Sequence, residues 1–544
     1  MIKRRLFPIS SVQKRSRLAF FVLLPLFALL AWFYVPVTHG DFVADDYVFL
    51  ATSRMVDTPL AAFWQNHFYA PDYFRPVGIV SWWLLTHFFG LDYASHSLVN
   101  LCLHAANAGL LLCLLRALAL PASGVVAGVV LFALGPFALA TILWPSNRFD
   151  LLAVGFLLIQ AIAMLRALQG NTLAVPLAML AALAACWSKE LAYPVATVMA
   201  CVALAASGAS WQRRALLFAL LGLAIGGAFF VRQVTVTGAF ALALTKGDPL
   251  GQIVNGATAM ISALPQLTQF IVGQERLPWF GWGLLGAVFA AMIWERRDAA
   301  ELNRLLGGAT LILLAAFIVQ TPLAKNFAPM LDGSTFGTVT FARFIYAPWI
   351  AVCVIVALII SRGRLGSMAA LTLVSVTVAA ATTARPLAES FADWTRKEVQ
   401  AVSVAATQAV EAGVTDDLPC VFVFLGTQSN HPYFRMFADV TVKARTTVPS
   451  KVWRCHVMTE STPWLFAFPT TLTPIDLPLR PVPAANGSAT PDSIWSSIRY
   501  RYRLPTLDLA ALPGARFFDW RGDQFVEATD DVRRGERKVK SQNW

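Results

Sequence analysis

The chain has 544 residues, of which 57% are hydrophobic and only 14% are charged, and its formal net charge is +12. This apolar content is above that of soluble domains and excludes a soluble globular protein. The positive charge does not indicate nucleic acid, because Lys and Arg gather at the ends of apolar runs, a pattern that reports membrane orientation. We expect a polytopic α-helical membrane protein in contact with membrane lipids and with no nucleic acid.

The first apolar run, residues 18–37, follows basic clusters at residues 3–5 and 14–17. A signal peptide has a shorter apolar core and a small-residue cleavage site, so this run is predicted to be an uncleaved span. With ten further runs long enough to cross the hydrocarbon layer, about eleven transmembrane helices are expected. The further runs are residues 97–115, 121–143, 150–167, 172–187, 191–207, 214–231, 279–294, 305–322, 344–361 and 366–382.

Basic turns set the predicted orientation. With a cytoplasmic N-terminus, the turns that carry Arg116, Arg166 and Arg213 fall on the cytoplasmic side, as the positive-inside rule requires. If the run from Pro76 to Gly90 crossed the membrane, these basic turns would fall on the outer side. The run is therefore predicted to be an aromatic-rich helix at the outer interface, with Trp82 and Trp83 at headgroup level. A second surface helix is predicted over residues 253–271 from apolar residues at three- and four-residue intervals.

The odd number of spans places the region after residue 384 outside as well. We therefore divide the chain into a transmembrane domain, residues 1–384, and a C-terminal extracytoplasmic domain, residues 385–544. The second domain begins with a helical pattern and continues with the apolar strand 421–425, so a small α/β domain is predicted. Cys420 and Cys455 lie in it and can form a disulfide if the compartment is oxidising, although the sequence gives no distance between them.

Three carboxylates, Asp41, Asp45 and Asp46, follow the first span directly. Neighbouring carboxylates repel each other and resist desolvation, so one of them can be held with a raised pKa, as a general base requires. The alternative is an ordinary solvated acidic loop.

Other polar groups lie at the predicted outer ends of spans, where burial of an ionisable residue is costly and therefore suggestive of function. By topology they share a face with the acidic pair. They are Arg75, Asn147-Arg148-Phe149-Asp150, Ser188-Lys189-Glu190, and Arg343 with Tyr346.

The second span carries His96, Asn100, His104 and Asn107 at steps of four, four and three residues, which places them on one helix face. Hydrogen bonding between helices accounts for such a stripe, above all for the deeper His104 and Asn107. His96, near the surface, can instead orient a substrate.

No Gly-rich phosphate loop after a strand, no Cys-x-x-Cys and no His-Glu-x-x-His occurs in the sequence. No cytoplasmic segment is long enough for a nucleotide-sugar-binding domain, so a sugar donor has to arrive through the membrane. No cofactor is expected. No metal is needed where cations stabilise a leaving phosphate, although the acidic pair is able to hold a divalent cation.

Taken in order, the motifs resemble the GT-C type of membrane glycosyltransferases, which use polyprenyl-phosphate sugars, and especially the protein O-mannosyltransferase branch and the animal enzymes with tetratricopeptide repeats. The resemblance covers roughly the first 350 residues. The matching stretches are residues 41–47, 73–76, 96–107, 147–150, 188–190 and 343–348.

This resemblance implies inversion at the sugar carbon, with the acidic pair in the first outer loop as the catalytic residues. Asp45 is assigned as the base that takes the proton of a hydroxyl acceptor, and Asp46 as the alternative base or its orienting partner. The candidates for holding the departing phosphate, and for the surrounding substrate contacts, are Arg75, His96, Arg148, Lys189, Glu190, Arg343 and Tyr346. Arg343 and Lys189 are the first candidates for the phosphate, with Glu190 positioning Lys189.

The predicted function is therefore a hexosyltransferase of the bacterial inner membrane that moves a sugar from a polyprenyl-phosphate donor to a glycan, lipid or protein on the periplasmic side. The chain lacks the tetratricopeptide repeats of the animal enzymes, which leaves a protein acceptor open. Two alternatives are a transporter or flippase of lipid-linked sugars, and a scaffold that recruits envelope enzymes. Transporters more often show internal repeats and broken helices, neither of which the sequence shows.

Overall fold

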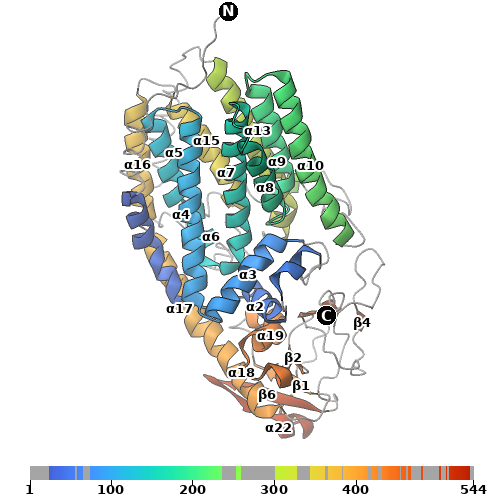
Figure 1. Ribbon diagram of the computed structural model, residues 1–544. Coiled ribbons are helices and arrows are strands. Elements are labelled where there is room, and N and C mark those ends of the chain that lie inside the picture. The colour runs from blue at the N-terminus through green and yellow to red at the C-terminus, as the bar shows by residue number, and fades with distance from the viewer. Residues whose placement is uncertain are drawn as a thin grey trace, which may run out of the picture. The chain divides into compact units, whose positions relative to one another are not determined.

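The computed structural model describes residues 24–55, 58–64, 74–235, 251, 253–255, 257–258, 300–327, 343–361, 365–382, 384–414, 420–426, 432–453, 455–460, 464–466, 480–481, 501–503, 510 and 514–539. The chain divides into two compact units (Figure 1). We call residues 1–38, 97–230 and 241–391 the helical unit, and residues 39–96, 231–240 and 392–544 the mixed unit. The first predicted outer loop thus groups with the C-terminal region, whereas the division predicted from sequence joined it to the spans.

Each predicted span is helical where its residues are described, although the run 121–143 forms two consecutive helices. The run 279–294 lies outside the described residues. Among the described residues, six helices are long and apolar enough to cross a membrane, or seven if one bent pair counts as a single span. The apolar helices Leu24–His39, α8 and α9 are shorter. The helices of this unit are α4 (Tyr93–Ala117), α5 (Ala122–Leu134), α6 (Pro136–Leu143), α7 (Arg148–Leu168), α8 (Ala174–Cys186), α9 (Ala192–Ala206), α10 (Trp211–Thr235), α13 (Ala300–Phe327), α15 (Tyr346–Ile360) and α16 (Gly366–Ala381), with the short turns η3 (Pro145–Asn147) and η6 (Arg343–Ile345).

Helix α7 is central in the bundle and α10 is peripheral. Of the apolar stretch that contains α7, 67% is buried inside the protein, compared with 17% of the apolar stretch of α10. Helix α7 packs against α8 and α9, and α15 packs against α5 and α13. Small residues allow the closest approach: a Cβ on Gly128 of α5 would lie 3.0 Å from the Cβ of Ala357 on α15. Helices in a bilayer associate through such close packing of small residues.

The predicted span 121–143 is bent by 52° between α5 and α6. The break falls at Pro136, the first residue of α6, which as a proline has no N–H with which to continue the preceding helix. The carbonyl of Leu131 accepts a hydrogen bond from the Trp349 indole N–H at 3.2 Å. The bend is therefore stabilised by a side chain of α15.

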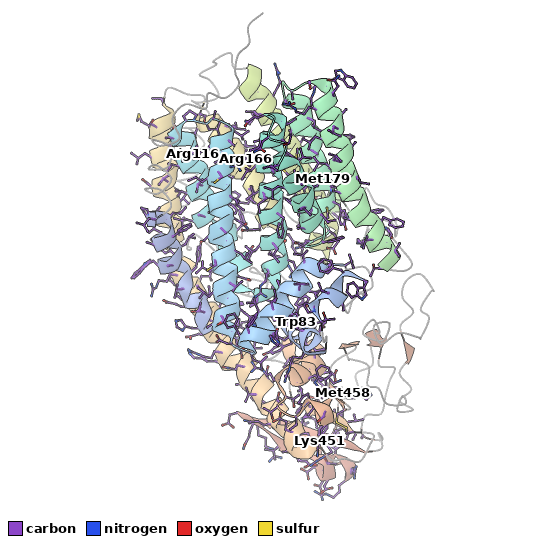
Figure 2. The ribbon with its side chains drawn as sticks, in the orientation of Figure 1. Trp83, Arg116, Arg166, Met179, Lys451 and Met458 are labelled. Atoms are coloured by element: carbon purple, nitrogen blue, oxygen red, sulfur yellow. A yellow bond between two sulfur atoms is a disulfide. The ribbon has the colours of Figure 1, made fainter. Side chains whose placement is uncertain are left out.

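Arg116, near the end of α4, and Arg166, near the end of α7, lie at the same end of the helical unit (Figure 2). Arg213, near the start of α10, donates to the carbonyl of Leu168 at 3.2 Å and so lies at that end as well. The common side that the positive-inside rule predicts for these three residues is confirmed within the bundle, and its assignment to the cytoplasm stays a prediction.

The mixed unit contains a four-stranded sheet in the order β2-β1-β6-β7, formed by β1 (Val421–Leu425), β2 (His456–Thr459), β6 (Ala515–Arg521) and β7 (Gln524–Glu527). Strand β1 is parallel to β2 and β6, with Val421 opposite both His456 and Ala515. Phe422 and Phe424 pack with α18 (Ala401–Gly413) and α19 (Pro432–Arg445), while Val423 faces a second cluster that includes Val532 of α22 (Thr529–Arg533). Burial on both faces explains why β1 is apolar throughout.

The remaining elements of the C-terminal region are shorter. They are α17 (Ala384–Trp394), the π-helix η7 (Thr395–Gln400), α20 (Pro449–Val452), and a three-stranded sheet of β3 (Trp464–Phe466), β5 (Arg501–Arg503) and β4 (Arg480–Pro481). The small C-terminal α/β region that the sequence predicts is thereby confirmed.

Cys420 and Cys455 form a disulfide. Each cysteine directly precedes one of the paired parallel strands, β1 and β2. The bond therefore joins the two strands where both begin, and it closes a loop that constrains the unfolded chain.

The first outer loop forms η1 (Val35–His39), α2 (Asp45–Met55), η2 (Pro59–Phe63) and α3 (Pro76–Phe89). Helix α3 confirms a helix over the predicted range, and Phe88 near its end is 71% exposed, while its place at the outer interface stays a prediction. Trp82 differs from the prediction: its side chain is fully buried, stacked on Phe49 and next to His96, so it is not at headgroup level. Most of the second predicted surface helix, 253–271, lies outside the described residues.

Acidification should destabilise the C-terminal sheet through His456. Burial, and next the nearby Lys443, lower the pKa of this histidine to about 4. Between pH 6.5 and 4 the unfolded chain then binds the proton more readily than the folded one, so stability is complete above pH 6.5 and falls as the pH drops towards 4, by about 2–3 kcal/mol.

Hydrogen exchange of the β1 and β2 peptides in the full-length protein in detergent, at pH 7 and pH 4.5, measures this loss. Substitution of His456 by Gln should reduce the difference between the two pH values, whereas His87→Gln, at an exposed position of α3, should not. An identical pH response in wild type and His456→Gln would contradict the assignment.

Candidate functional site

The acidic stretch folds into a tight turn that leads into α2. The carbonyl of Val43 accepts from the Asp46 N–H at 3.1 Å, and the Val43 N–H donates to Asp46 Oδ2 at 2.9 Å. Asp46 is fully buried, whereas Asp45 is partly exposed. Both carboxylates lie in the first turn of α2, where the helix dipole favours negative charge. Asp45 is thus the member of the pair with access to solvent, and Asp46 holds the turn.

Ala44, between the turn and the helix, has a φ of 52°. A residue with a Cβ pays about 1–2 kcal/mol for this left-handed conformation. Such conformations persist where the surroundings fix them, and they gather at functional sites. The acidic turn therefore stores strain next to Asp45.

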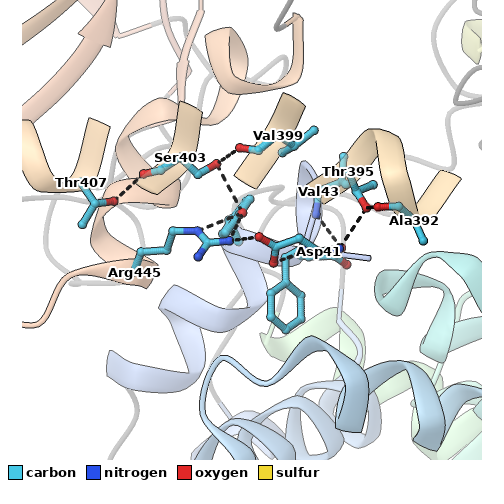
Figure 3. Close-up of polar contacts among 11 residues, drawn as sticks. Asp41, Val43, Ala392, Thr395, Val399, Ser403, Thr407 and Arg445 are labelled. Carbon is cyan, nitrogen blue, oxygen red and sulfur yellow. Dashed lines mark hydrogen bonds and ion pairs between the residues drawn. The ribbon is translucent and has the colours of Figure 1, made fainter. Parts of the chain in front are cut away.

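Arg445, the last residue of α19, contacts the residues on either side of this turn (Figure 3). Its guanidinium pairs with the Asp41 carboxylate and donates to the Tyr47 hydroxyl from Nε at 3.1 Å and from Nη2 at 2.9 Å. Tyr47 in turn donates to Ser403 Oγ at 3.4 Å. Sequence analysis missed Arg445, which is 404 positions from Asp41 and belongs to no motif.

Burial sets the electrostatics of this network. It raises the pKa of Asp41, and the positive charge of Arg445 offsets only part of that rise. It also raises the pKa of Tyr47, so the phenol stays protonated. Burial lowers the pKa of Arg445, but Tyr47 and Asp41 raise it by more, so the guanidinium keeps its charge.

A second attachment holds the start of the acidic stretch. The Asp41 N–H donates to Thr395 Oγ1 at 3.0 Å, and Thr395 begins the π-helix η7. A Cβ on Gly40 would lie 2.8 Å from the same oxygen, so only glycine fits this close approach. Single π-helical turns of this kind often occur at functional sites.

The remaining predicted residues of the mixed unit are Arg75 and His96. Arg75 is the residue before α3 and is partly exposed. His96 is fully buried, with its ring 5.1 Å from that of Phe42 and 5.2 Å from that of Trp82, and its Nε2 lies 3.3 Å from the carbonyl oxygen of Gly90. This environment favours a structural role for His96, and its contact with substrate stays a prediction.

In the helical unit, Lys189 is held by Asp150. Its Nζ donates to both carboxylate oxygens, at 2.5 and 2.6 Å, and the two side chains are 9% and 3% exposed. Sequence analysis grouped Asp150 with Arg148 and assigned it no partner. The charge of Lys189 is thus compensated by a buried carboxylate, and its contact with a phosphate stays a prediction.

Arg148 is fully buried at the start of α7, and its Nε donates to Asn100 Oδ1 at 3.1 Å. Asn100 itself donates to the carbonyl oxygens of Trp144 and Pro145. The guanidinium of Arg343 lies 4.7 Å from the ring centroid of Trp144, a cation–π distance. Arg343 contacts the short segment between α6 and α7 directly, and Arg148 is linked to it through Asn100.

Tyr346, the first residue of α15, is fully buried. Its hydroxyl lies 2.9 Å from His104 Nδ1 and accepts from Asn107 Nδ2 at 3.4 Å. The polar stripe of α4 therefore makes the hydrogen bonds between helices that the sequence predicts for its deeper members.

The predicted site residues fall into two groups, one in each unit. The helical unit brings Arg148, Lys189, Glu190, Arg343 and Tyr346 to one end of its bundle. Lys189 is held by Asp150, and its positioning by Glu190 stays a prediction. The mixed unit holds Asp45, Asp46, Arg75 and His96. That all of them line one outer rim stays a prediction.

An apolar cavity of about 740 Å³ lies within the helical unit. Leu, Val, Ile and Ala side chains of α7, α9, α13 and α15 form most of its lining. It begins at Val154, one turn after Asp150, and at Ala347, next to Tyr346, and it continues to Leu168 and Arg213. At 1.5 Å per residue, its extent along α7 is about 20 Å.

Among the described residues, no three His, Cys, Asp or Glu side chains gather as the ligands of a metal ion do.

No protein-family model and no curated protein matches the chain. Solved structures similar to it include ArnT from Cupriavidus metallidurans bound to undecaprenyl phosphate, with a TM-score of 0.47 and 12% identity over 82% of this chain and 90% of that one. They also include the archaeal oligosaccharyltransferase AglB from Archaeoglobus fulgidus in complex with an inhibitory peptide and a dolichol-phosphate, with a TM-score of 0.42 and 12% identity over 83% and 65%. Both are GT-C glycosyltransferases, the class that the sequence motifs resemble.

Substitution of Lys189 by Met should strongly destabilise the helical unit, because it leaves the Asp150 carboxylate buried without its charge partner. Breaking a buried ion pair in this way costs about 3–5 kcal/mol. Thermal unfolding of the purified protein in detergent measures the loss, and the double variant Lys189→Met with Asp150→Leu should recover much of it. The matched control is Lys397→Met, because Lys397 pairs with Asp393 on an exposed surface and such pairs contribute little. Equal unfolding midpoints for wild type and Lys189→Met would contradict a structural role for the pair.

Proposed function

We propose that the protein is a membrane glycosyltransferase that moves a sugar from a polyprenyl-phosphate donor to a hydroxyl group of a cell-envelope glycan, lipid or protein. The observation that carries this proposal is the helical unit's polarity along α7. Charged and hydrogen-bonding side chains gather at the start of this helix, and the apolar cavity begins one turn further on.

An amphiphilic lipid phosphate is the kind of substrate that fits this arrangement. Its isoprenoid chain would occupy the apolar cavity, where burial of hydrocarbon is favourable. Its phosphate would lie towards Arg148, Arg343 and the Lys189–Asp150 pair. We assign the phosphate contact first to Arg343, because it is partly exposed whereas Arg148 is fully buried, and because a planar guanidinium matches the geometry of a phosphate.

In the proposed reaction, the acceptor hydroxyl attacks the anomeric carbon and its proton moves to a carboxylate. The bond from that carbon to the phosphate oxygen breaks, and the polyprenyl phosphate leaves with the electron pair. Attack opposite the leaving group inverts the configuration. Asp45 is the proposed base, because it has solvent access while Asp46 is buried and bonded to the Val43 N–H.

The proposed location is the bacterial inner membrane, with the acidic turn and the C-terminal region in the periplasm. The Cys420–Cys455 disulfide supports this, because such bonds persist in oxidising compartments such as the periplasm. No cofactor is assigned, and the leaving phosphate is stabilised by cationic side chains in this scheme.

Substitution of Asp45 by Asn should lower the rate of transfer by at least about 10²-fold, because only the proton acceptor is lost. Synthetic undecaprenyl-phosphate hexoses serve as the donor probes and an envelope extract as the acceptor, with released undecaprenyl phosphate measured by mass spectrometry. The control is Asp523→Asn, in the exposed turn between β6 and β7. Full release by Asp45→Asn and by Asp46→Asn would remove the enzyme proposal, and movement of lipid-linked sugar without release would favour the transporter.

Substitution of Ala309 by Phe, inside the cavity, should raise the KM for an undecaprenyl donor by about tenfold. The larger side chain would displace about two methylene groups of the donor, and the lost burial weakens binding by about this factor. A donor with a chain too short to reach the cavity should be affected far less. The control is Ala379→Phe, on an exposed face of α16. Equal KM changes for long and short donors would contradict chain binding in the cavity.

A further inference from the structure

The C-terminal region contributes a side chain to the acidic turn. Arg445 belongs to α19, whose residues Phe434, Ala438 and Val442 share a core cluster with β1 and β2 in the same compact unit. Its guanidinium is bonded on one side to Asp41 and on the other to the Tyr47 hydroxyl. These two residues bracket the five positions 42–46, which include Asp45 and Asp46. One side chain therefore closes the acidic turn from both ends.

A second link ties the same helices together. Arg54, in the last turn of α2, donates to the carbonyl oxygens of Ala444 at 2.5 Å and Thr446 at 3.2 Å. The C-terminal end of α19 is thus bonded both to Tyr47, near the start of α2, and to Arg54, in the last turn of α2. Asp45 is the first residue of this helix.

The strain at Ala44 explains why the attachment is needed. A φ of 52° at a residue with a Cβ is unfavourable on its own, and the turn would relax if its flanks were released. A guanidinium suits the task because its donors form a rigid planar fork that fixes the geometry between two acceptors, whereas an ammonium group on its flexible stem has no such fork.

We propose that Arg445 is a positioning residue of the transfer reaction: the C-terminal region holds the acidic turn in its strained form through Arg445, so that Asp45 is aimed at the acceptor hydroxyl. This rests on the proposed function. Arg445 itself makes no contact with substrate in this account, and it acts through Asp41 and Tyr47.

The test compares Arg445→Gln with Arg516→Gln in the full-length protein. Arg516 is a matched control, because it also joins parts of the C-terminal region, pairing with Glu527 at 2.5 Å and donating to the Gly413 carbonyl, but it does not contact the acidic turn. With undecaprenyl-phosphate hexose as the probe, Arg445→Gln should lower kcat by about 10²-fold and change the KM for the donor by less than about threefold, since misplacement of a reacting group by about 1 Å costs that much rate. Arg445→Lys should restore only part of kcat.

Hydrogen exchange gives a readout that does not depend on activity. Residues 42–47 should exchange at least about tenfold faster in Arg445→Gln than in wild type or Arg516→Gln, because the flanks of the turn are released. The double variant Asp41→Asn with Arg445→Gln should lose no more kcat than Arg445→Gln alone, as expected for two residues that act as one unit.

The outcomes separate the two proposals. If wild type releases no undecaprenyl phosphate from any donor, the proposed function fails while the exchange result still decides whether Arg445 holds the turn. If wild type is active and Arg445→Gln keeps its kcat and its slow exchange, the positioning role is overturned. Equal losses of kcat in Arg445→Gln and Arg516→Gln, in proportion to lowered unfolding midpoints, would also overturn it.

Discussion

The Arg445–Asp41–Tyr47 contact is the constraint on which the acidic turn depends. The carboxylates of Asp45 and Asp46 repel each other in the first turn of α2, and the Asp41 carboxylate is buried. Ala44, with its positive φ, adds backbone strain. A buried guanidinium with hydrogen bonds to both flanks offsets part of that cost, because an ion pair with complete hydrogen bonding is far less unfavourable than an unpaired buried charge. The result is a single partly exposed carboxylate, Asp45, presented on a fixed turn.

In the helical unit, charged side chains are held inside an apolar bundle by specific partners. Asp150 compensates Lys189, Asn100 accepts from Arg148, and Trp144 stacks on Arg343. Each charged group is thus paired with a partner suited to its geometry, at the end of the bundle where the cavity begins. In the proposed function, this is the feature that favours an amphiphilic lipid phosphate over a water-soluble substrate.

The sequence predicts what local patterns determine. Apolar runs gave helices wherever the residues are described, the basic turns at Arg116 and Arg166 share one end, and the apolar β1 is buried on both faces. The cysteine pair was left open by the sequence and is bonded in the structure.

Contacts between distant segments were not predictable: no periodicity links Arg445 to Asp41, or Asp150 to Lys189 over the turn between α8 and α9. Trp82 was misplaced because an amphipathic interfacial helix and a helix packed on its own loop share the same composition.

Photolabelling tests the central claim most directly, because it asks where the lipid phosphate binds without assuming a sugar or an acceptor. The full-length protein in nanodiscs would be irradiated with an undecaprenyl phosphate that carries a diazirine in its chain, and the labelled peptides mapped by mass spectrometry. The account predicts labelling of cavity-lining residues on α7, α9, α13 and α15, suppressed by undecaprenyl phosphate but not by undecaprenol. Labelling confined to the outward faces of α10 and α16, or equal suppression by the alcohol, would contradict it.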